Sequence, residues 1–320
     1  IITMKKNITI YLLLALACLG LQSCLFQEEN YFDDSSANRA TADVNRCGEL
    51  LKAAPNGWVM EYYVGKDYSL GGITLLCRFD GQRVTMASQM SEADETVSSL
   101  YSVKSEQATM LSFDTYNYLV HYFGQPQGSM SDDPNGTLGG DYEFIISSAS
   151  AERIELKGKK YGNRIVMKAL SEDQTWKQYL TKIKKVEDDA FFYEYDLLMD
   201  GLYTGQMLRS NYTFIVTYYD EIGKVHQKTV PFMFTADGMR FHEPVTIDGQ
   251  TMQNFVWKNE LISFVCTDEG ATGIKLAGVY TAGYQSYDYY PGTYQMDFYR
   301  LNDETQQLEV ASQEVRLLKN

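Results

Sequence analysis

Side chains that can bind a ligand gather between residues 114 and 143 of the chain. They are Tyr116, Tyr118, His121, Tyr122, Asp141 and Glu143. Aromatic faces can stack on sugar rings, while carboxylates accept hydrogen bonds from hydroxyl groups. The stretch includes a long loop rich in Gly, Pro and Asp, and such loops often carry the binding sites of β proteins. We therefore expect a glycan or peptide site here, or else rings that plug one end of a barrel, with His121 bonded to a buried partner.

Asp141 and Glu143 also offer the carboxylate pair that acid/base hydrolysis requires, with His121 nearby in the sequence. The sequence patterns of helical zinc hydrolases, serine hydrolases and phosphate-binding loops do not occur in the chain. A triad assembled from distant residues stays open, because it leaves no local pattern. We favour a protein that is not an enzyme and has no cofactor, with a carboxylate-dependent hydrolase as the alternative.

Asp132, Asp133 and Asn135 present oxygen atoms of the kind that Ca²⁺ prefers. Their spacing departs from a calcium-binding EF-hand loop, because Ser131 stands at the first ligand position and Tyr142 at the twelfth, where a Glu is expected. Asp, Asn, Pro and Gly also favour turns. We therefore predict a solvated turn without metal and keep these three residues as the calcium alternative.

A different chemistry is predicted at Cys24. Two lysines and then an apolar run of 13 residues, Ile8 to Gly20, precede it. That run has the length of a signal-peptide core and is shorter than the roughly 20 residues of a membrane-spanning helix. Its end, Leu21-Gln22-Ser23-Cys24, resembles the lipobox of bacterial lipoproteins, in which the cysteine thiol receives a diacylglycerol. We expect residues 1–23 to be a lipoprotein signal peptide; a plain secreted protein is the alternative.

Residues 24–32 are expected to form an acidic tether behind this anchor. Gln27-Glu28-Glu29 resembles the export signal that places lipoproteins of Bacteroidetes-type bacteria on the outer face of the outer membrane. A simple solvated tether is the alternative, because charged linkers stay extended. We expect a protein that is lipid-anchored at the outer membrane, on the cell surface or on the periplasmic face.

The charge of the chain argues against nucleic acid as a partner. There are 28 Lys and Arg residues against 42 Asp and Glu residues, a net charge of −14. Loss of residues 1–23 would remove two lysines and no acidic residue, leaving a net charge of −16. A surface this acidic repels nucleic-acid phosphates and anionic lipid headgroups. The membrane partner is therefore expected to be held through the N-terminal lipid.

Three further cysteines, Cys47, Cys77 and Cys266, lie on apolar faces of predicted elements. An odd number permits at most one disulfide among them. Unpaired cysteine behaves as a small hydrophobic side chain. We predict three buried free thiols and keep a disulfide or a reactive role as the alternative.

The chain after the tether is predicted to be mainly β with a few helices. Its 25 tyrosines and 15 phenylalanines favour strands, and its length suggests two domains. We expect an N-terminal β domain over residues 33–170 and a C-terminal β domain over residues 171–320. Each is predicted to be a leading helix followed by an antiparallel meander that closes as a barrel or folds as a sandwich.

Local patterns place the elements of these two domains. Apolar residues at helical spacing run from Ala37 to Ala54 and again from Trp176 to Val186. Asp80-Gly81 predicts a sharp hairpin. Strands are expected at 58–63, 73–79, 83–88, 100–104, 109–113, 142–147, 153–157, 164–170, 212–219, 228–234, 240–244, 254–258, 261–266, 274–280, 293–301 and 307–317.

The two halves of the chain also share short motifs. Asp80-Gly81-Gln82-Arg83-Val84 is similar to Asp237-Gly238-Met239-Arg240-Phe241, and Leu111-Ser112-Phe113 to Ile262-Ser263-Phe264. The two offsets, 157 and 151 residues, are nearly equal. A duplicated helix-plus-meander unit would explain them, and chance similarity between hairpins is the alternative, because Asp-Gly turns recur in β proteins.

Several segments taken together resemble a known family of lipoproteins from Bacteroidetes, the domain of unknown function 4302. They are Ala54-Pro55-Asn56-Gly57-Trp58, Glu61-Tyr62-Tyr63, Leu111 to Asn117, His121, Gly139 to Phe144 and Leu156 to Lys160. The resemblance covers residues 30 to 170 most closely. It implies an accessory role beside an outer-membrane nutrient-import complex and supplies no catalytic residue.

Residues and resemblance together favour a lipid-anchored binding or accessory protein for glycan or peptide nutrients. An import complex of the outer membrane is the expected partner. A structural lipoprotein that packs on an outer-membrane partner is a further alternative to the hydrolase.

Overall fold

The computed structural model describes residues 35–127, 136–220, 222–279, 293–301 and 308–317. The chain divides into two compact units, one that extends to Ala42 and one that starts at Asp43. The second unit contains two closed barrels, which we name barrel 1 and barrel 2. The prediction of a mainly β protein built from two antiparallel meanders is confirmed, and both meanders close as barrels.

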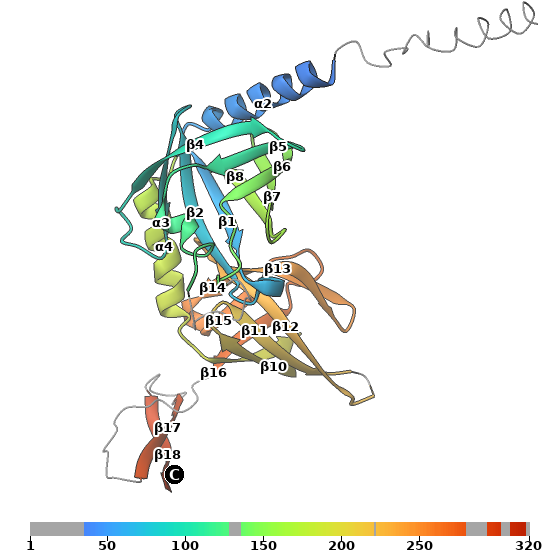
Figure 1. Cartoon of the computed structure of the whole chain (residues 1–320). Coiled ribbons are helices and arrows are strands. Elements are labelled where there is room, and N and C mark those ends of the chain that lie inside the picture. The colour runs from blue at the N-terminus through green and yellow to red at the C-terminus, as the bar shows by residue number, and fades with distance from the viewer. Residues whose placement is uncertain (1–34, 128–135, 221, 280–292, 302–307, 318–320) are drawn as a thin grey trace, which may run out of the picture. The chain divides into compact units, whose positions relative to one another are not determined.

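Barrel 1 has eight antiparallel strands whose order around the barrel follows the chain (Figure 1). They are β1 (Trp58–Tyr63), β2 (Gly72–Phe79), β3 (Arg83–Ser88), β4 (Val97–Ser105), β5 (Thr109–Phe113), β6 (Glu143–Ala149), β7 (Arg153–Gly158) and β8 (Arg164–Ala169). The barrel closes where β1 pairs with β8, with Trp58 opposite Ala169. Closure pairs every strand on both sides, so no sheet edge is left open.

Barrel 2 repeats this topology with another eight strands. They are β9 (Glu194–Met199), β10 (Leu202–Ser210), β11 (Thr213–Tyr219), β12 (Val225–Phe234), β13 (Gly238–Ile247), β14 (Gln250–Lys258), β15 (Ser263–Cys266) and β16 (Ile274–Val279). Here β9 closes the barrel by pairing with β16, with Met199 opposite Ile274. Two further strands, β17 (Thr293–Leu301) and β18 (Leu308–Leu317), pair with each other as a separate hairpin.

Three α-helices lie before or between these strands in the described part of the chain. They are α2 (Ser36–Ala53), α3 (Tyr118–His121) and α4 (Trp176–Asp189), with short 3₁₀ turns η2 (Lys66–Tyr68) and η4 (Asn259–Leu261). A capping box starts α4, because Thr175 and Gln178 each bond the backbone of the other. No helix in the described ranges is long and apolar enough to span a bilayer.

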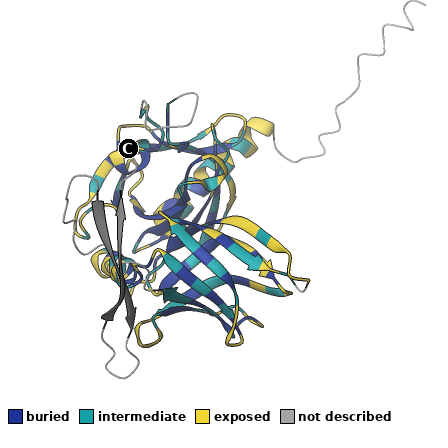
Figure 2. Cartoon of the chain, turned by 90° about the horizontal axis from the view of Figure 1, so that it is seen from below, coloured by how far each residue is buried: buried dark blue, intermediate teal, exposed yellow. Residues whose placement is uncertain are grey.

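The two barrels are packed on side chains that alternate along the strands, and buried and less buried residues alternate in the same way in Figure 2. β1 and β5 are exceptions, because all of their residues are buried. Trp58, Met60 and Tyr62 belong to the core of barrel 1. Val59 belongs instead to a second core, which contains the apolar stripe of α4 and the interior of barrel 2. Both faces of β1 are therefore covered.

The predicted strands and the two predicted helices match observed elements in position, but two strands and the short helix α3 were not expected. No strand was expected between Val186 and Tyr212, where β9 and β10 lie. Glu194 and Asp196 alternate with buried residues in β9, and acidic side chains are uncommon in strands. A register shift between Tyr203 and Gly205 disturbs the alternation of β10. Division into two domains at residue 170 stays a prediction.

The three cysteines predicted to be core residues are buried and free of disulfides in the structure. Cys47 lies on α2, Cys77 on β2 and Cys266 on β15. Burial raises the pKa of all three thiols, that of Cys266 to about 11. They are therefore protonated at neutral pH, which disfavours a reactive role.

The matched motifs of the two halves fall on different strand pairs. Asp80-Gly81 joins the second and third strands of barrel 1, whereas Asp237-Gly238 stands between the fourth and fifth strands of barrel 2. The Leu111 motif lies on the fifth strand of its barrel and the Ile262 motif runs into the seventh. Duplication is thus favoured by the shared helix-plus-eight-strand topology, and the motif matches do not align equivalent strands.

Candidate functional site

Barrel 1 carries four exposed tyrosines and His121 on one connection between strands, and we call these five residues the aromatic surface. Tyr116, Tyr118, Tyr122 and Tyr142 are 63, 36, 40 and 41% exposed. They come from the connection between β5 and β6, which includes α3. The chain turns into α3 at the fully buried Asn117, whose side chain accepts a hydrogen bond from the Leu119 backbone and donates one to Ser99 Oγ.

The connection that carries these tyrosines also fills the end of barrel 1. Leu119, Val120 and Phe123 belong to the core of barrel 1 and are at most 6% exposed. Two expectations were given for this segment, a ligand-binding surface and side chains that plug the barrel, and they apply to different side chains. Its aliphatic residues and one phenylalanine pack inward, while the tyrosines remain at the surface.

His121 contacts two tyrosines of the aromatic surface, Tyr116 and Tyr142. Its ring stacks on Tyr142, with centroids 4.5 Å apart and planes 18° from parallel. Its Nδ1 lies 3.0 Å from the Asn117 carbonyl oxygen, a backbone partner of the kind that was expected. Burial lowers the pKa of His121, so the ring is neutral at pH 7.

Asp141 is buried and bonded to the backbone rather than presented to a ligand. It is 4% exposed, and its Oδ1 accepts a hydrogen bond from the Lys160 backbone at 2.7 Å, while Oδ2 accepts one from Tyr161 at 3.1 Å. Gly158 packs so closely against this carboxylate that a Cβ there would collide with it. Burial raises the pKa of Asp141, and the two backbone donors oppose that shift. Asp141 thus braces the turn between β7 and β8.

Glu143 occupies a different environment from Asp141. Its carboxylate lies 2.8 Å from Lys104 Nζ and 3.1 Å from Lys159 Nζ, and both lysines also pair with Glu106. The hydrogen bond from Lys104, followed by that from Lys159, holds the pKa of Glu143 below its usual range. The two carboxylates of the predicted pair are therefore engaged with separate partners.

The calcium candidates Asp132, Asp133 and Asn135 lie outside the described residues. Within the residues that the structure describes, no group of three or more His, Cys, Asp or Glu side chains is arranged to hold a metal ion. Cys24 and the acidic tether also lie outside the described ranges.

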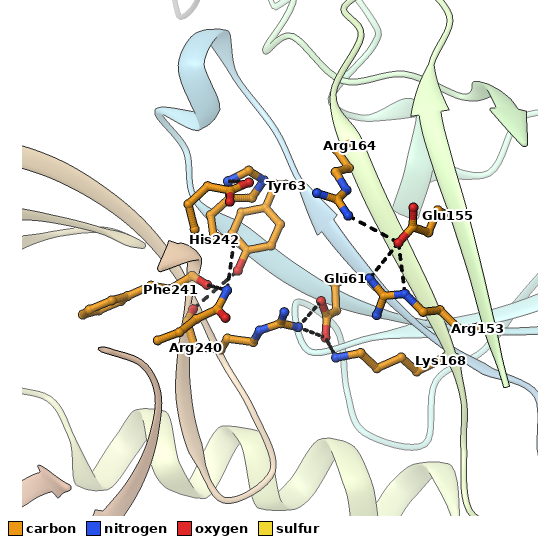
Figure 3. A network of polar contacts seen from close by, with 11 residues as sticks. Glu61, Tyr63, Arg153, Glu155, Arg164, Lys168, Arg240, Phe241 and His242 are labelled. Atoms are coloured by element: carbon orange, nitrogen blue, oxygen red, sulfur yellow. Dashed lines mark hydrogen bonds and ion pairs between the residues drawn. The ribbon is translucent and has the colours of Figure 1, made fainter. Parts of the chain in front are cut away.

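A second candidate site, which the sequence did not indicate, lies where barrel 1 meets barrel 2. We call it the inter-barrel pocket; it has a volume of about 90 Å³. Its lining residues are Glu61, Tyr63, Arg153, Arg164, Val166, Arg240, His242, Glu243 and Gln253. They come from β1, β7 and β8 of the first barrel and from β13 and β14 of the second. Figure 3 shows most of them with their polar contacts.

Glu61 of β1 connects the two barrels beside this pocket. Arg240 Nη1 donates to Glu61 Oε1 at 2.9 Å and to Oε2 at 2.7 Å. Lys168 Nζ of β8 lies 2.5 Å from Oε1, so Glu61 stands between two cations (Figure 3). The Glu61 side chain is only 10% exposed. A carboxylate that is this buried is stabilised by its paired cations.

His242 packs against two tyrosines on the other side of the pocket. Its ring centroid lies 4.5 Å from that of Tyr63 and 3.9 Å from that of Tyr68. Burial lowers the pKa of His242, Glu243 and Glu61 oppose the shift, and Arg164 and Arg240 add to it. His242 is therefore neutral at pH 7.

Two exposed arginines of barrel 1 complete the pocket. Arg153 and Arg164 both pair with Glu155, at 3.0 and 3.3 Å, and their side chains are 40 and 55% exposed. The hydrogen bonds from Arg153 are the largest cause that lowers the pKa of Glu155. Both guanidinium groups thereby bond the same carboxylate of Glu155 (Figure 3).

A weak local signal for this pocket exists in the sequence. Glu61 and Tyr63, Arg153 and Glu155, and Arg240 and His242 each stand two residues apart on one strand. That spacing puts each pair on one face of its strand. It does not say which faces meet, since Glu61 and Arg240 are 179 residues apart.

Comparison with known proteins identifies the family of the chain. A sequence profile of the family described as "Domain of unknown function (DUF4302)" matches residues 28–259. The match extends through barrel 1 and through the sixth strand of barrel 2. No curated protein matches the chain. Because the profile covers more than half of the sequence and agrees with the resemblance in residues 30 to 170, the chain belongs to the DUF4302 family.

Proposed function

We propose that this chain is a lipid-anchored accessory or binding protein of the outer membrane, without enzymatic activity, which captures glycan or peptide nutrients beside an import complex. The observation that carries the proposal is the aromatic surface, where one connection between strands exposes four tyrosines, two of which contact His121. Exposed tyrosines provide rigid apolar area together with a polar end, and they are enriched where proteins bind ligands and partners.

The surroundings of the tyrosines suit a ligand with both ring faces and hydroxyl or amide groups. Tyr116 OH lies 3.1 Å from Gln125 Oε1, and Tyr118 OH donates to Glu95 Oε1 at 2.7 Å. Polar groups therefore stand at the edges of the exposed rings. A sugar ring or a peptide side chain can stack on Tyr116 or Tyr122 and bond to these neighbours.

The membrane part of the proposal depends on Cys24. The apolar run that ends at this residue supports a lipid anchor, and Gln27-Glu28-Glu29 supports outward export. The net charge of −14 supports attachment through lipid rather than through charge. The periplasmic face of the outer membrane is the alternative location.

The hydrolase alternative receives less support from the carboxylates. Asp141 is buried against the backbone of Lys160 and Tyr161, and Glu143 is paired with two lysines. Neither arrangement leaves the two groups facing one cleft, as acid/base hydrolysis requires. A structural lipoprotein without a small ligand is the other alternative, and capture of an outer-membrane partner in the absence of any glycan or peptide binding would favour it.

The binding proposal is tested with the full-length chain in detergent on arrays of glycans and peptides. We expect a binder whose affinity falls about tenfold in the double variant Tyr116→Ala and Tyr122→Ala, because each lost ring contact is worth about 0.5–1.5 kcal/mol. The control replaces Tyr203 and Tyr219 of barrel 2, which are 58 and 49% exposed, with Ala. An array without any binder, or equal losses in both double variants, would contradict the proposal.

The location is tested in cells. Cys24→Ser is expected to release the chain from the membrane fraction, and protease added to intact cells is expected to digest the wild-type chain. A chain that stays in the membrane without Cys24 would refute the lipid anchor. Protection of the anchored chain until the outer membrane is opened would move it to the periplasmic face.

A further inference from the structure

The inter-barrel pocket has an excess of positive charge in an acidic protein. Three arginines, Arg153, Arg164 and Arg240, line it together with two glutamates, Glu61 and Glu243. With His242 neutral, the lining carries one net positive charge, whereas the whole chain carries −14. Because a concave site concentrates the field of the charges that line it, this pocket attracts anions where the rest of the surface repels them.

Each of the three arginines keeps hydrogen-bond donors that its protein partners do not use. Arg240 contacts Glu61 through Nη1 alone, and its buried Nε has no acceptor among the described residues. Arg153 donates to Glu155 through Nε and Nη2, and Arg164 through Nη2. A guanidinium group has five N–H donors, so an acceptor in the pocket can be bound from more than one side.

The glutamates orient these arginines rather than block them. Glu61 of β1 holds Arg240, and Glu155 of β7 holds Arg153 of the same strand and Arg164 of the neighbouring β8. Such fixed side chains lose little conformational entropy when a ligand binds. Pre-orientation by carboxylates thus favours a ligand that pairs with several arginines at once.

The size of the pocket limits the ligand. A water needs at least roughly 10–15 Å³ of such space. The 90 Å³ present therefore accommodate several waters, or one small group with two to four oxygen atoms. Planar carboxylates and tetrahedral sulfate or phosphate groups have this size and match the fork of an arginine.

We propose that the inter-barrel pocket binds an oxyanion group, a carboxylate, sulfate or phosphate, through Arg153, Arg164 and Arg240. The group is free in solution or is the acidic substituent of a larger molecule that extends out of the pocket past Arg164. This site is distinct from the aromatic surface and does not depend on the function proposed for it.

The proposal is tested by NMR on the full-length chain in detergent, observing the arginine Nε–Hε signals during titration. Sodium sulfate, sodium phosphate, acetate and glucuronate are the probes, at constant ionic strength set with chloride. We expect saturable shifts of the signals of the three arginines, with a dissociation constant of about 1 mM or lower for at least one probe. Saturation by acetate or glucuronate identifies a carboxylate ligand, and saturation by sulfate or phosphate identifies a tetrahedral one.

Variants separate this pocket from other cationic sites. The double variant Arg153→Gln and Arg164→Gln is expected to weaken binding at least tenfold, and both side chains are exposed enough for the fold to tolerate the change. The double variant with Lys at both positions keeps the charge but loses the forks, and is expected to bind with intermediate affinity. The matched control is Arg83→Gln, an exposed arginine of barrel 1 that bonds Ser98.

Two results would overturn the proposal. One is the absence of saturable shifts with all four probes. The other is an equal dissociation constant in the wild type and in the Arg153→Gln, Arg164→Gln variant, which would place the anion elsewhere.

Discussion

Barrel 1 and barrel 2 share eight strands in the same order, yet different parts of the chain complete their cores. In barrel 1 the connection between β5 and β6 enters the core through Leu119, Val120 and Phe123. Barrel 2 is filled by aromatic side chains of its own strands, with Phe214 stacked on Phe232 at 4.4 Å. Its leading helix α4 joins the same core.

This difference explains where exposed aromatic residues gather on barrel 1. A connection that passes into a barrel has inward positions for aliphatic side chains and outward positions for others. The outward positions of the β5–β6 connection are tyrosines, whereas short hairpins leave barrel 2 without an equivalent insertion among its described connections. Identical strand topology therefore permits different surfaces, because the connections rather than the strands supply them.

The largest expected effect tests whether the two barrels fold as one. Phe144→Ala in barrel 1 and Phe232→Ala in barrel 2 each remove a fully buried ring and should lower the free energy of unfolding by about 3–5 kcal/mol. Val59 of β1 lies in the same core as α4 and the interior of barrel 2, so we expect each loss to destabilise both barrels.

Urea titrations of variants that retain a single tryptophan measure this coupling. Trp58 reports on barrel 1 and Trp257 on barrel 2, and the other tryptophans are replaced with Phe. Coincident transitions, shifted equally by either variant, are expected. Two separate transitions, with each variant shifting only its own, would show that the barrels are independent.

The next effect concerns the ion pair between the barrels. Glu61→Ala leaves Arg240 partly buried without its partner and should lower the free energy of unfolding by about 3 kcal/mol. The double variant Glu61→Leu and Arg240→Met should recover most of that loss, because apolar side chains replace a buried ion pair with little cost.

The control for this cycle is the pair of Asp94 and Lys177, whose side chains are 68 and 64% exposed. Asp94→Ala should leave the urea midpoint unchanged, because solvent screens exposed pairs. Equal changes from Glu61→Ala and Asp94→Ala would mean that burial does not strengthen the contact between the barrels.

A smaller effect separates the structural from the catalytic interpretation of Asp141. Asp141→Asn keeps the shape but weakens the bonds from Lys160 and Tyr161, and should lower the free energy of unfolding by about 1–3 kcal/mol. Glu143→Gln should change stability less, because the Glu143 side chain is 27% exposed and pairs with two lysines that are more exposed still. If Asp141→Asn left stability unchanged, the brace that we assign to this carboxylate would be wrong.

The smallest expected effect is a dependence of stability on pH, to which one histidine of the aromatic surface and one of the inter-barrel pocket contribute. Burial lowers the pKa of His121 in the aromatic surface and of His242 in the pocket below the ordinary value of about 6.5. The unfolded chain then binds protons that the folded chain does not, so stability is highest above about pH 6.5 and falls as the pH decreases below that value.

Urea midpoints between about pH 7.5 and pH 5.5 measure this dependence, since most carboxylates stay ionised over that range. His121→Gln and His242→Gln are each expected to reduce the decline, and the double variant to reduce it further. A decline that persists unchanged in the double variant would assign it to other groups.

Most of the fold could be predicted because its signals are local. Strands such as Trp58–Tyr63 and Arg83–Ser88 were expected with the bounds that the structure has, since runs rich in β-branched and aromatic residues favour strands and turn residues mark their ends. β9 and β10 were missed where acidic residues and a register shift obscure the strand pattern.

The sequence predicted the candidate site as one segment, but the structure places the residues of that segment in different environments. The six residues proposed from one stretch of chain include exposed tyrosines, a half-buried histidine, a buried Asp141 and a paired Glu143. Their types alone do not distinguish these environments, because exposure depends on what packs on each side chain after the barrel closes. Whether they bind a ligand stays a prediction.

The sequence by itself determined the β-rich composition, the two helix-plus-meander halves, the buried cysteines and the family. These follow from side-chain type and from periodicity within ten residues or so. Only the tertiary structure decided that the meanders close as barrels and that Glu61 meets Arg240 across them. Alternation assigns a side chain to a face, but closure and docking of the barrels select the face that it meets, and that choice depends on the packing of residues far apart in the chain.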